Sequence, residues 1–127
     1  MKIVHFTDLH VDLKYTEGSS INCDNILCCR AEEGFPVDPK NQAPPYGNYW
    51  CDIPAQLFYA MGDFIKSELK PDTILWTGDI PPHDQWAYSE EYIKTYSTFL
   101  SDYFRENFTD YSIHVLEGNH DFVVPNS

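Results

Sequence analysis

Three short apolar segments of this chain each run directly into side chains that can bind metal ions. In chain order they are KIVHFT (2–7) before Asp8-Leu9-His10, TILWT (73–77) before Gly78-Asp79, and SIHVLE (112–117) before Gly118-Asn119-His120-Asp121. Such β-branched segments are typical of buried parallel strands, and we expect the first to be a central strand. Because the carboxyl ends of parallel strands meet at one edge of a sheet, the three clusters should lie together there.

Two amphipathic helices are predicted between these strands. The first has Asp52 as its cap and Pro54 near its start, and it ends before Pro71. Its apolar stripe is formed by Ile53, Leu57, Ala60, Met61, Phe64, Ile65 and Leu69. The second helix opens at Ser89, and its stripe is formed by Ile93, Tyr96, Phe99, Leu100, Tyr103 and Phe104. The order strand, long loop, helix, strand, helix, strand predicts an α/β fold with a largely parallel sheet.

The long loop, residues 11–51, is rich in proline and glycine, has no helical or strand periodicity, and contains every cysteine of the chain. Cys23, Cys28, Cys29 and Cys51 allow three pairings. A bond between the adjacent Cys28 and Cys29 would be strained, and of the two remaining pairings we favour Cys23–Cys28 with Cys29–Cys51. Free thiols in a reducing cytosol are one alternative. A structural zinc site is another, although the usual CxxC pairs are absent.

A structureless insertion of this length is uncommon unless it is functional, disordered or cross-linked. Two disulfides would each contribute about 2–4 kcal/mol and would indicate an oxidising compartment. The triplet Asn107-Phe108-Thr109 is an N-glycosylation acceptor and agrees with that location.

The charge of the chain is strongly acidic, with 8 Lys and Arg against 20 Asp and Glu and a net charge of -12. Such a surface repels phosphate backbones and anionic lipid heads, which argues against a nucleic-acid polymer as partner. Two bound divalent cations would offset about four of these charges. No stretch approaches the roughly 20 apolar residues of a membrane span, and residues 1–10 lack the features of a signal peptide.

The residue types at the strand ends suit a metal centre. Asp8 and His10 alternate along an extended segment, so both side chains can bind one cation. Asp79 follows a glycine that permits a sharp turn, and its two oxygens can bridge two metals. Asn119 adds a neutral carbonyl oxygen. Mixed imidazole, carboxylate and amide ligands suit zinc, iron or manganese better than calcium.

The remaining polar residues of the clusters suit phosphoryl transfer. Two metals about 3.5–4 Å apart activate a water and stabilise the attacking and leaving oxygens. His120 could protonate the leaving group, and Asp121 could orient its imidazole. His83, placed at the same edge by two prolines, could contact substrate or donate a proton. Each motif alone occurs by chance in many proteins, whereas all three in this order indicate a site.

These motifs occur in the order that is the signature of calcineurin-like metallophosphoesterases. The segments 7–10 (TDLH), 27–30 (LCCR), 51–54 (CDIP) and 76–84 (WTGDIPPHD) resemble the acid sphingomyelinase branch, and the likeness extends from Ile3 to Asn126. The resemblance implies hydrolysis of a phosphodiester, either a lipid such as sphingomyelin or a nucleotide, with peripheral membrane contact through a lipid substrate. It also implies a secreted or lysosomal glycoprotein.

The resemblance further implies two zinc ions and the disulfides Cys23–Cys28 and Cys29–Cys51. Asp8, His10 and Asp79 would serve the first zinc, and Asp79 and Asn119 the second. His120 and His83 would flank the phosphate, and one of them would protonate the leaving group.

The family takes three further histidine ligands from a second half that does not correspond to these 127 residues. We therefore expect residues 1–127 to be the N-terminal half of the catalytic domain, with 11–51 as an insertion and with one sheet face and one sheet edge uncovered. Two hypotheses follow. The parent protein hydrolyses phosphodiesters, or this chain is an inactive fragment or a non-catalytic, disulfide-stapled extracellular module. In either case we expect little turnover from the chain alone.

Overall fold

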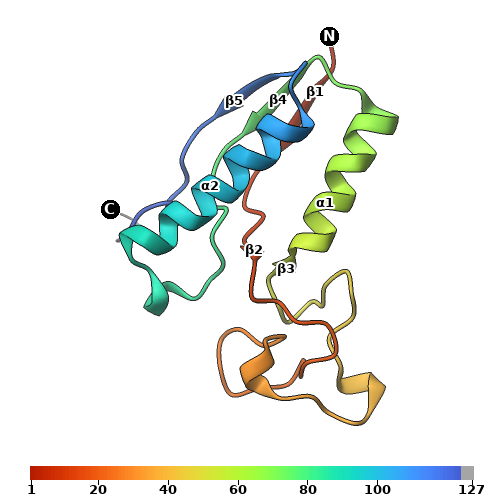
Figure 1. Ribbon diagram of the computed structural model, residues 1–127, viewed down its shortest axis with the longest axis vertical. Coiled ribbons are helices and arrows are strands. Elements are labelled where there is room, and N and C mark those ends of the chain that lie inside the picture. The colour runs from red at the N-terminus through yellow and green to blue at the C-terminus, as the bar shows by residue number, and fades with distance from the viewer. Residues whose placement is uncertain (124–127) are drawn as a thin grey trace.

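A three-stranded parallel sheet carries the strand-end clusters. The computed structural model describes residues 1–123 and places β1 (Ile3–Phe6), β4 (Thr73–Trp76) and β5 (Ser112–Val115) in the order β1-β4-β5 (Figure 1). Both pairings are parallel, and Trp76 lies between Phe6 and Val115, so the three strands end level. The predicted α/β fold with parallel strands is confirmed. Residues 124–126, the end of the resemblance, lie outside the described residues.

β4 is the middle strand of the described sheet, so the expectation of a central first strand is wrong. Among the described strands, β1 pairs with β4 alone, whereas β4 has a neighbour on each side, and this is why Ile74 and Trp76 are almost completely buried. The sheet face turned away from the helices is open within residues 1–123, as expected. Its side chains include Ile3, His5 and His114, which are exposed.

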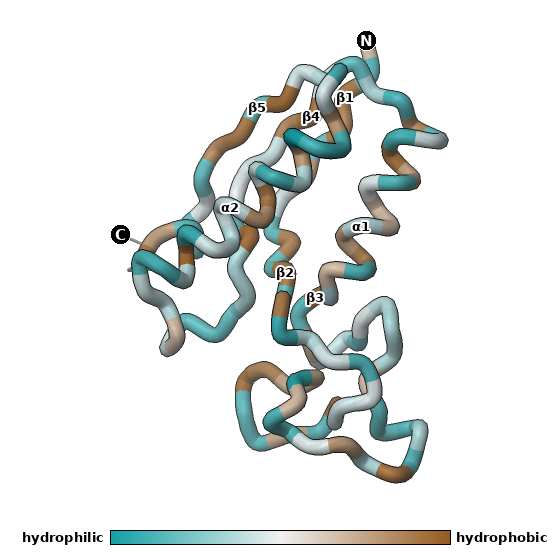
Figure 2. The backbone as a smooth tube through the Cα atoms, in the orientation of Figure 1, coloured by the Kyte–Doolittle hydropathy of each residue, from teal (hydrophilic) through white to brown (hydrophobic). Residues whose placement is uncertain are grey.

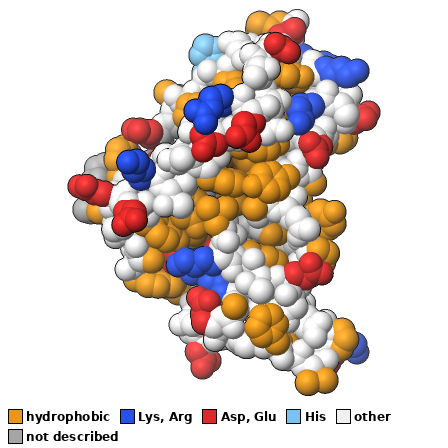
Figure 3. All heavy atoms as spheres, in the orientation of Figure 1, with side chains coloured by type: hydrophobic (Ala, Val, Ile, Leu, Met, Phe, Trp, Pro, Cys, Tyr) orange, Lys and Arg blue, Asp and Glu red, His pale blue; other side chains and the backbone are white. Residues whose placement is uncertain are grey.

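Two helices cover the other face of the sheet (Figure 1). α1 (Ala55–Phe64) continues as a π turn over Ile65–Leu69 and ends before Pro71, as predicted. α2 (Glu90–Asn107) begins after Ser89, whose hydroxyl accepts a hydrogen bond from the Tyr92 N–H. The core between helices and sheet is formed mainly by Phe6, Phe58, Ile65, Ile74, Trp76, Tyr96, Leu100, Tyr103 and Phe104. Hydrophobic side chains also reach the surface across the middle of the face shown in Figure 3.

The buried stripe of α1 differs from the predicted one. Phe58, outside the predicted stripe, is 2% exposed, whereas Ala60 and Phe64 are exposed. The cause is the close contact with α2, because a Cβ on Gly62 would overlap the Tyr103 hydroxyl. The helix therefore turns its glycine towards α2, and Phe58, one turn earlier on the same side, packs against the Tyr103 ring at 4.6 Å between centroids.

Residues 11–51, which we call the stapled segment, form irregular structure beside this core (Figure 1). It begins with β2 (Val11–Asp12), which pairs in parallel with β3 (Ile53–Pro54), and it contains two short 3-10 turns, Ala31–Glu33 and Pro39–Asn41. The favoured disulfides, Cys23–Cys28 and Cys29–Cys51, are the ones present. Cys28, Cys29 and Ala43 form a small core separate from the main one.

Hydrophobic residues run along β1, β4 and β5 and also occur at several places in the stapled segment (Figure 2). Over residues 1–123, no helix combines the length and the apolar character that a membrane span requires.

Candidate metal centre

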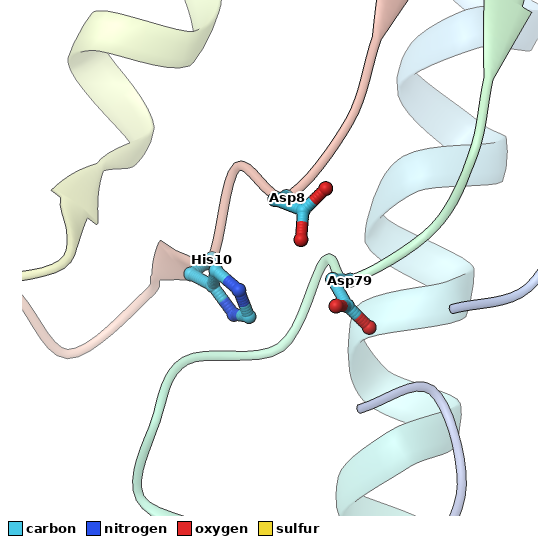
Figure 4. Close-up of side chains that lie close together, drawn as sticks. All are labelled: Asp8, His10 and Asp79. Atoms are coloured by element: carbon cyan, nitrogen blue, oxygen red, sulfur yellow. The ribbon is translucent and has the colours of Figure 1, made fainter. Parts of the chain in front are cut away.

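The clusters that follow β1 and β4 meet at the carboxyl edge of the sheet. Asp8, His10 and Asp79 each offer one ligand atom, and these atoms all lie within 4.8 Å of one another (Figure 4). Asp8 is exposed, His10 is half-buried and Asp79 is buried, so the group is open to solvent on one side. Two carboxylates and one imidazole at this separation fit a divalent cation of the zinc, iron or manganese type.

The backbone at this group is left-handed, not extended as predicted. The φ angles are 53° at Asp8, 44° at His10 and 58° at Asp79, a conformation that costs roughly 1–3 kcal/mol per non-glycine residue. Hydrogen bonds between the two loops stabilise it, since the Asp8 N–H donates to Gly78 O (3.1 Å) and the His10 N–H donates to Asp79 O (3.0 Å). Two turns, and not strand alternation, therefore bring Asp8 and His10 together.

The loops after β4 and β5 meet through two glycines. A Cβ on Gly78, whose φ is 92°, would overlap the backbone of Gly118. A Cβ on Gly118 would overlap the carboxylate of Asp79. The Gly-Asp and Gly-Asn-His motifs consequently need glycine because the two loops pack backbone against backbone.

Asp121 holds this junction and does not orient His120 as we predicted. Its Oδ2 accepts hydrogen bonds from the N–H groups of Asp79 (2.8 Å) and Gly118 (2.7 Å), and its Oδ1 accepts one from Ile80 (3.1 Å). The sharp turn at Gly78 leaves these N–H groups without strand partners, and the carboxylate three residues after Gly118 satisfies them. Asp121 thus fixes the position of Asp79.

His10 is held with one ring nitrogen free. Its Nδ1 lies 2.8 Å from the carbonyl oxygen of Pro81, and because a carbonyl only accepts, Nδ1 carries the proton. Nε2 then keeps its lone pair for a cation. Burial lowers the pKa of His10 and so favours the neutral ring. A hydrogen bond from the Thr7 hydroxyl lowers the pKa of Asp8, which keeps that carboxylate ionised.

His83 lies against His10, as its predicted place near this edge requires. The ring centroids of the two histidines are 3.8 Å apart. Both the N–H (2.7 Å) and the Nδ1 (2.8 Å) of His83 contact the carboxylate of Asp52. This pairing raises the pKa of His83. Asp52 therefore does not cap α1, whose N-cap position is occupied by Pro54.

His120 completes a group of three imidazoles. Its ring centroid lies 5.0 Å from that of His10 and 5.3 Å from that of His83. The His120 N–H donates to Asp79 Oδ1 (2.7 Å), and its Nδ1 lies 3.2 Å from the Tyr88 hydroxyl. Asn119, between Gly118 and His120, is exposed beside this group. His5 and His114 lie away from this group, on the open sheet face, where they contact Thr77 and Ser112.

Several predicted and unpredicted residues take other roles. Asp84, the last residue of the WTGDIPPHD segment, is fully buried and pairs with Arg30. Asp52 and Tyr88, the partners of His83 and His120, were not recognised from the sequence. The amide nitrogen of Asn107, the predicted glycosylation site, donates to Tyr103 O (3.0 Å) at the end of α2.

Comparison with known proteins identifies the family of this chain. The family described as calcineurin-like phosphoesterase matches residues 1–126. Sphingomyelin phosphodiesterase B of Dictyostelium discoideum is 35% identical over 130 residues, which cover all of this chain and 20% of that protein. Human sphingomyelin phosphodiesterase is 31% identical over 127 residues, covering 99% of this chain and 20% of that protein. The mouse acid sphingomyelinase-like phosphodiesterase 3b is 36% identical over 123 residues, covering 93% and 25%. The chain thus spans a fifth to a quarter of these relatives.

Proposed function

This chain belongs to the calcineurin-like phosphoesterase family, and we propose that it contributes ligands and proton-transfer groups to a two-metal phosphodiester hydrolase site. The observation that carries the proposal is the convergence of Asp8, His10 and Asp79 within 4.8 Å, with two further imidazoles beside them. Separate loops supply these side chains at strained backbone positions, which is typical of functional sites and costly for stability.

Four residues would hold the cations. Asp8 and the free Nε2 of His10 would bind the first, Asp79 would reach both, and Asn119 would offer its carbonyl oxygen to the second. The donor set suits zinc, iron or manganese, and the resemblance to the acid sphingomyelinase branch favours Zn²⁺ among them. Divalent cations supply electrostatic stabilisation of the charge that develops on a transferring phosphoryl group.

The two remaining histidines would act on the substrate. Asp52 holds Nδ1 of His83 and raises its pKa, so His83 keeps a proton to higher pH and suits contact with a phosphate oxygen. His120 would then protonate the leaving oxygen, while Tyr88 keeps its Nδ1 engaged. The alternative is that His83 protonates the leaving oxygen and His120 contacts the phosphate. Comparing the activities of the two single variants distinguishes these assignments.

The substrate class is a phosphodiester lipid of the sphingomyelin type, with a nucleotide phosphodiester as the alternative. Relatives that carry the name sphingomyelin phosphodiesterase support the lipid. The net charge of -12 disfavours a nucleic-acid polymer. Two disulfides favour a secreted or lysosomal location, and a chain on the way to either would also receive a glycan on Asn107.

The proposal is tested by titrating the 127-residue chain with Zn²⁺ in a calorimeter, which measures the affinity. We expect binding that His10→Gln weakens by at least about tenfold, because one of few ligands is lost. His114→Gln, which changes an exposed histidine away from the cluster, should leave the affinity unchanged. Equal effects of the two variants, or no binding by the wild type, would contradict the proposal.

Turnover is the second readout. Hydrolysis of bis(p-nitrophenyl) phosphate at mildly acidic pH should be weak with this chain alone, and Asp79→Asn should abolish it. A chain that binds Zn²⁺ at this cluster without measurable turnover would favour the non-catalytic alternative for these 127 residues.

A further inference from the structure

Arg30 of the stapled segment is a buried arginine that joins two loops of the site. Its side chain is 4% exposed. Nε and Nη2 contact the two oxygens of Asp12 at 2.7 and 3.1 Å, and Nη1 contacts Asp84 at 2.9 Å. Both carboxylates are almost completely buried. One guanidinium therefore binds two aspartates that come from different parts of the chain.

The two aspartates that bind Arg30 lie close in sequence to His10 and His83. Asp12 lies two residues after His10, and Asp84 directly follows His83. The ring centroids of His10 and His83 are 3.8 Å apart. Each ring therefore belongs to a segment that Arg30 binds one or two residues further along the chain. Because each carboxylate lies within two residues of one of these imidazoles, we expect a change in the distance between the carboxylates to alter the distance between the rings.

α2 holds the same cluster from a third direction. The Tyr92 hydroxyl lies 2.7 and 2.8 Å from the two oxygens of Asp84. Lys14 lies 3.6 Å from Asp84 and is half-exposed. Arg30 therefore does not act on loose loops, because Asp84 is already anchored to the helix layer. What Arg30 adds is the connection from Asp84 to Asp12.

The Cys29–Cys51 disulfide connects Arg30 to a second contact of the site, the one between Asp52 and His83. Arg30 follows Cys29, and Asp52, which binds the backbone and ring of His83, follows Cys51. Each half of this disulfide thus directly precedes a residue that holds a site loop. Cys23–Cys28, in contrast, closes a short loop of sequence separation 5.

Stability alone is a poor explanation for burying these charges. Removing ionised groups from water costs several kcal/mol per ion, and well-packed apolar residues often serve as well or better. A guanidinium offers what apolar residues do not, a rigid fork that sets the distance and direction of two carboxylates. A lysine would keep the charge and lose the fork.

We propose that Arg30 is a positioning residue, which sets the spacing of His10 and His83 through Asp12 and Asp84. Its importance for catalysis rests on the proposed function, whereas its effect on the two rings does not. The stapled segment then serves as a brace for the metal centre from outside the sheet.

The test compares Arg30→Lys with Arg105→Lys in the full 127-residue chain. Arg105 pairs with Asp102 at 2.7 Å on the exposed face of α2, so the control removes the same fork from a surface pair. The first readout is the nuclear Overhauser contact between the ring protons of His10 and His83 without metal. The second is the Zn²⁺ affinity. We expect Arg30→Lys to lose the ring contact and to weaken Zn²⁺ binding by about tenfold, as loss of an outer partner does. Arg105→Lys should match the wild type in both.

A rescue experiment covers the case in which Arg30→Lys does not fold. Arg30→Ala leaves space for a free guanidinium ion, and millimolar guanidinium should restore the ring contact, whereas sodium at equal ionic strength should not. A folded Arg30→Lys with the ring contact intact would overturn the proposal. Unfolding of both variants without rescue would overturn it too, because Arg30 would then serve stability alone. A wild type that binds no Zn²⁺ would count against the proposed function, and the ring contact would still decide the role of Arg30.

Discussion

The helix-covered sheet and the stapled segment maintain their structures by different means. The sheet layer is held by packing, with Trp76 and Tyr96 each about 2% exposed or less between strands and helices. The stapled segment has a core of Cys28, Cys29 and Ala43, and it depends on two disulfides and on the buried Arg30. The metal cluster lies where the two meet. This difference indicates that packing positions the strand ends, whereas the disulfides and the ion pairs of Arg30 position the loops that carry the metal ligands.

The largest effect should come from a change in the packed layer. Trp76→Ala removes the ring that contacts Phe6, Phe58 and Phe104, and it should lower the free energy of unfolding by about 3–5 kcal/mol. Chemical denaturation followed by circular dichroism measures this. Trp86→Ala, at a residue 62% exposed, is the matched control and should stay within about 0.5 kcal/mol of the wild type. Similar losses for both would show that packing does not dominate this layer.

Removal of a disulfide should affect the stapled segment first. Replacing Cys29 and Cys51 by alanine opens a loop of 22 residues, and replacing Cys23 and Cys28 opens a loop of 5. Chain entropy predicts a loss of about 2–4 kcal/mol for the longer loop and about 1 kcal/mol less for the shorter one. Hydrogen exchange should show that protection falls in residues 11–51 and persists in β4 and α2. Loss of protection in both layers at once would contradict the division.

Changes at the contact between α1 and α2 should have smaller effects on the free energy of unfolding, and two variants there should differ in sign. Gly62→Ala places a methyl group on the Tyr103 hydroxyl and should cost about 1–3 kcal/mol. That hydroxyl is buried and has no hydrogen-bond partner among the described residues, so Tyr103→Phe should be neutral or stabilising by about 1 kcal/mol. The double variant should recover part of the loss. A double variant as unstable as Gly62→Ala would locate the strain elsewhere.

The smallest expected effect is on proton binding at His83. Asp52 raises the pKa of His83 in the folded chain. The contribution of this pair to stability is therefore complete below the pKa of His83 in the unfolded chain, and it is lost as the pH rises through the pKa of His83 in the folded chain. Asp52→Asn should lower the pKa of His83 in an NMR titration of the metal-free chain. Asp38→Asn, at an exposed turn of the stapled segment, is the control and should leave that pKa unchanged. A titration that is the same in both variants would remove Asp52 from the account.

The predictable features were those that local pattern determines. The alternation of strands and helices, the start at Ser89 and the stripe of α2 follow from periodicity and capping. The meeting of Asp8, His10 and Asp79 follows from the rule that parallel strands place their carboxyl ends at one edge.

The features that escaped prediction depend on contacts between distant residues. Asp52 precedes a proline and a helix, so it was interpreted as a cap, although it binds His83 across 31 residues. Asp121 lies beside His120 in sequence, yet its oxygens reach N–H groups left free by a turn 41 and 42 residues earlier. The left-handed backbone at Asp8 and His10 has only a weak sequence signal, because Asp and His are enriched in this conformation but adopt it far less often than glycine.

The most direct test of the metal centre is anomalous X-ray diffraction from crystals of the chain soaked with Zn²⁺. The account predicts that the strongest anomalous peak lies between the carboxylates of Asp8 and Asp79 and Nε2 of His10. At saturating Zn²⁺, a map with no peak at these three side chains, or with its main peak at other residues, would contradict the account.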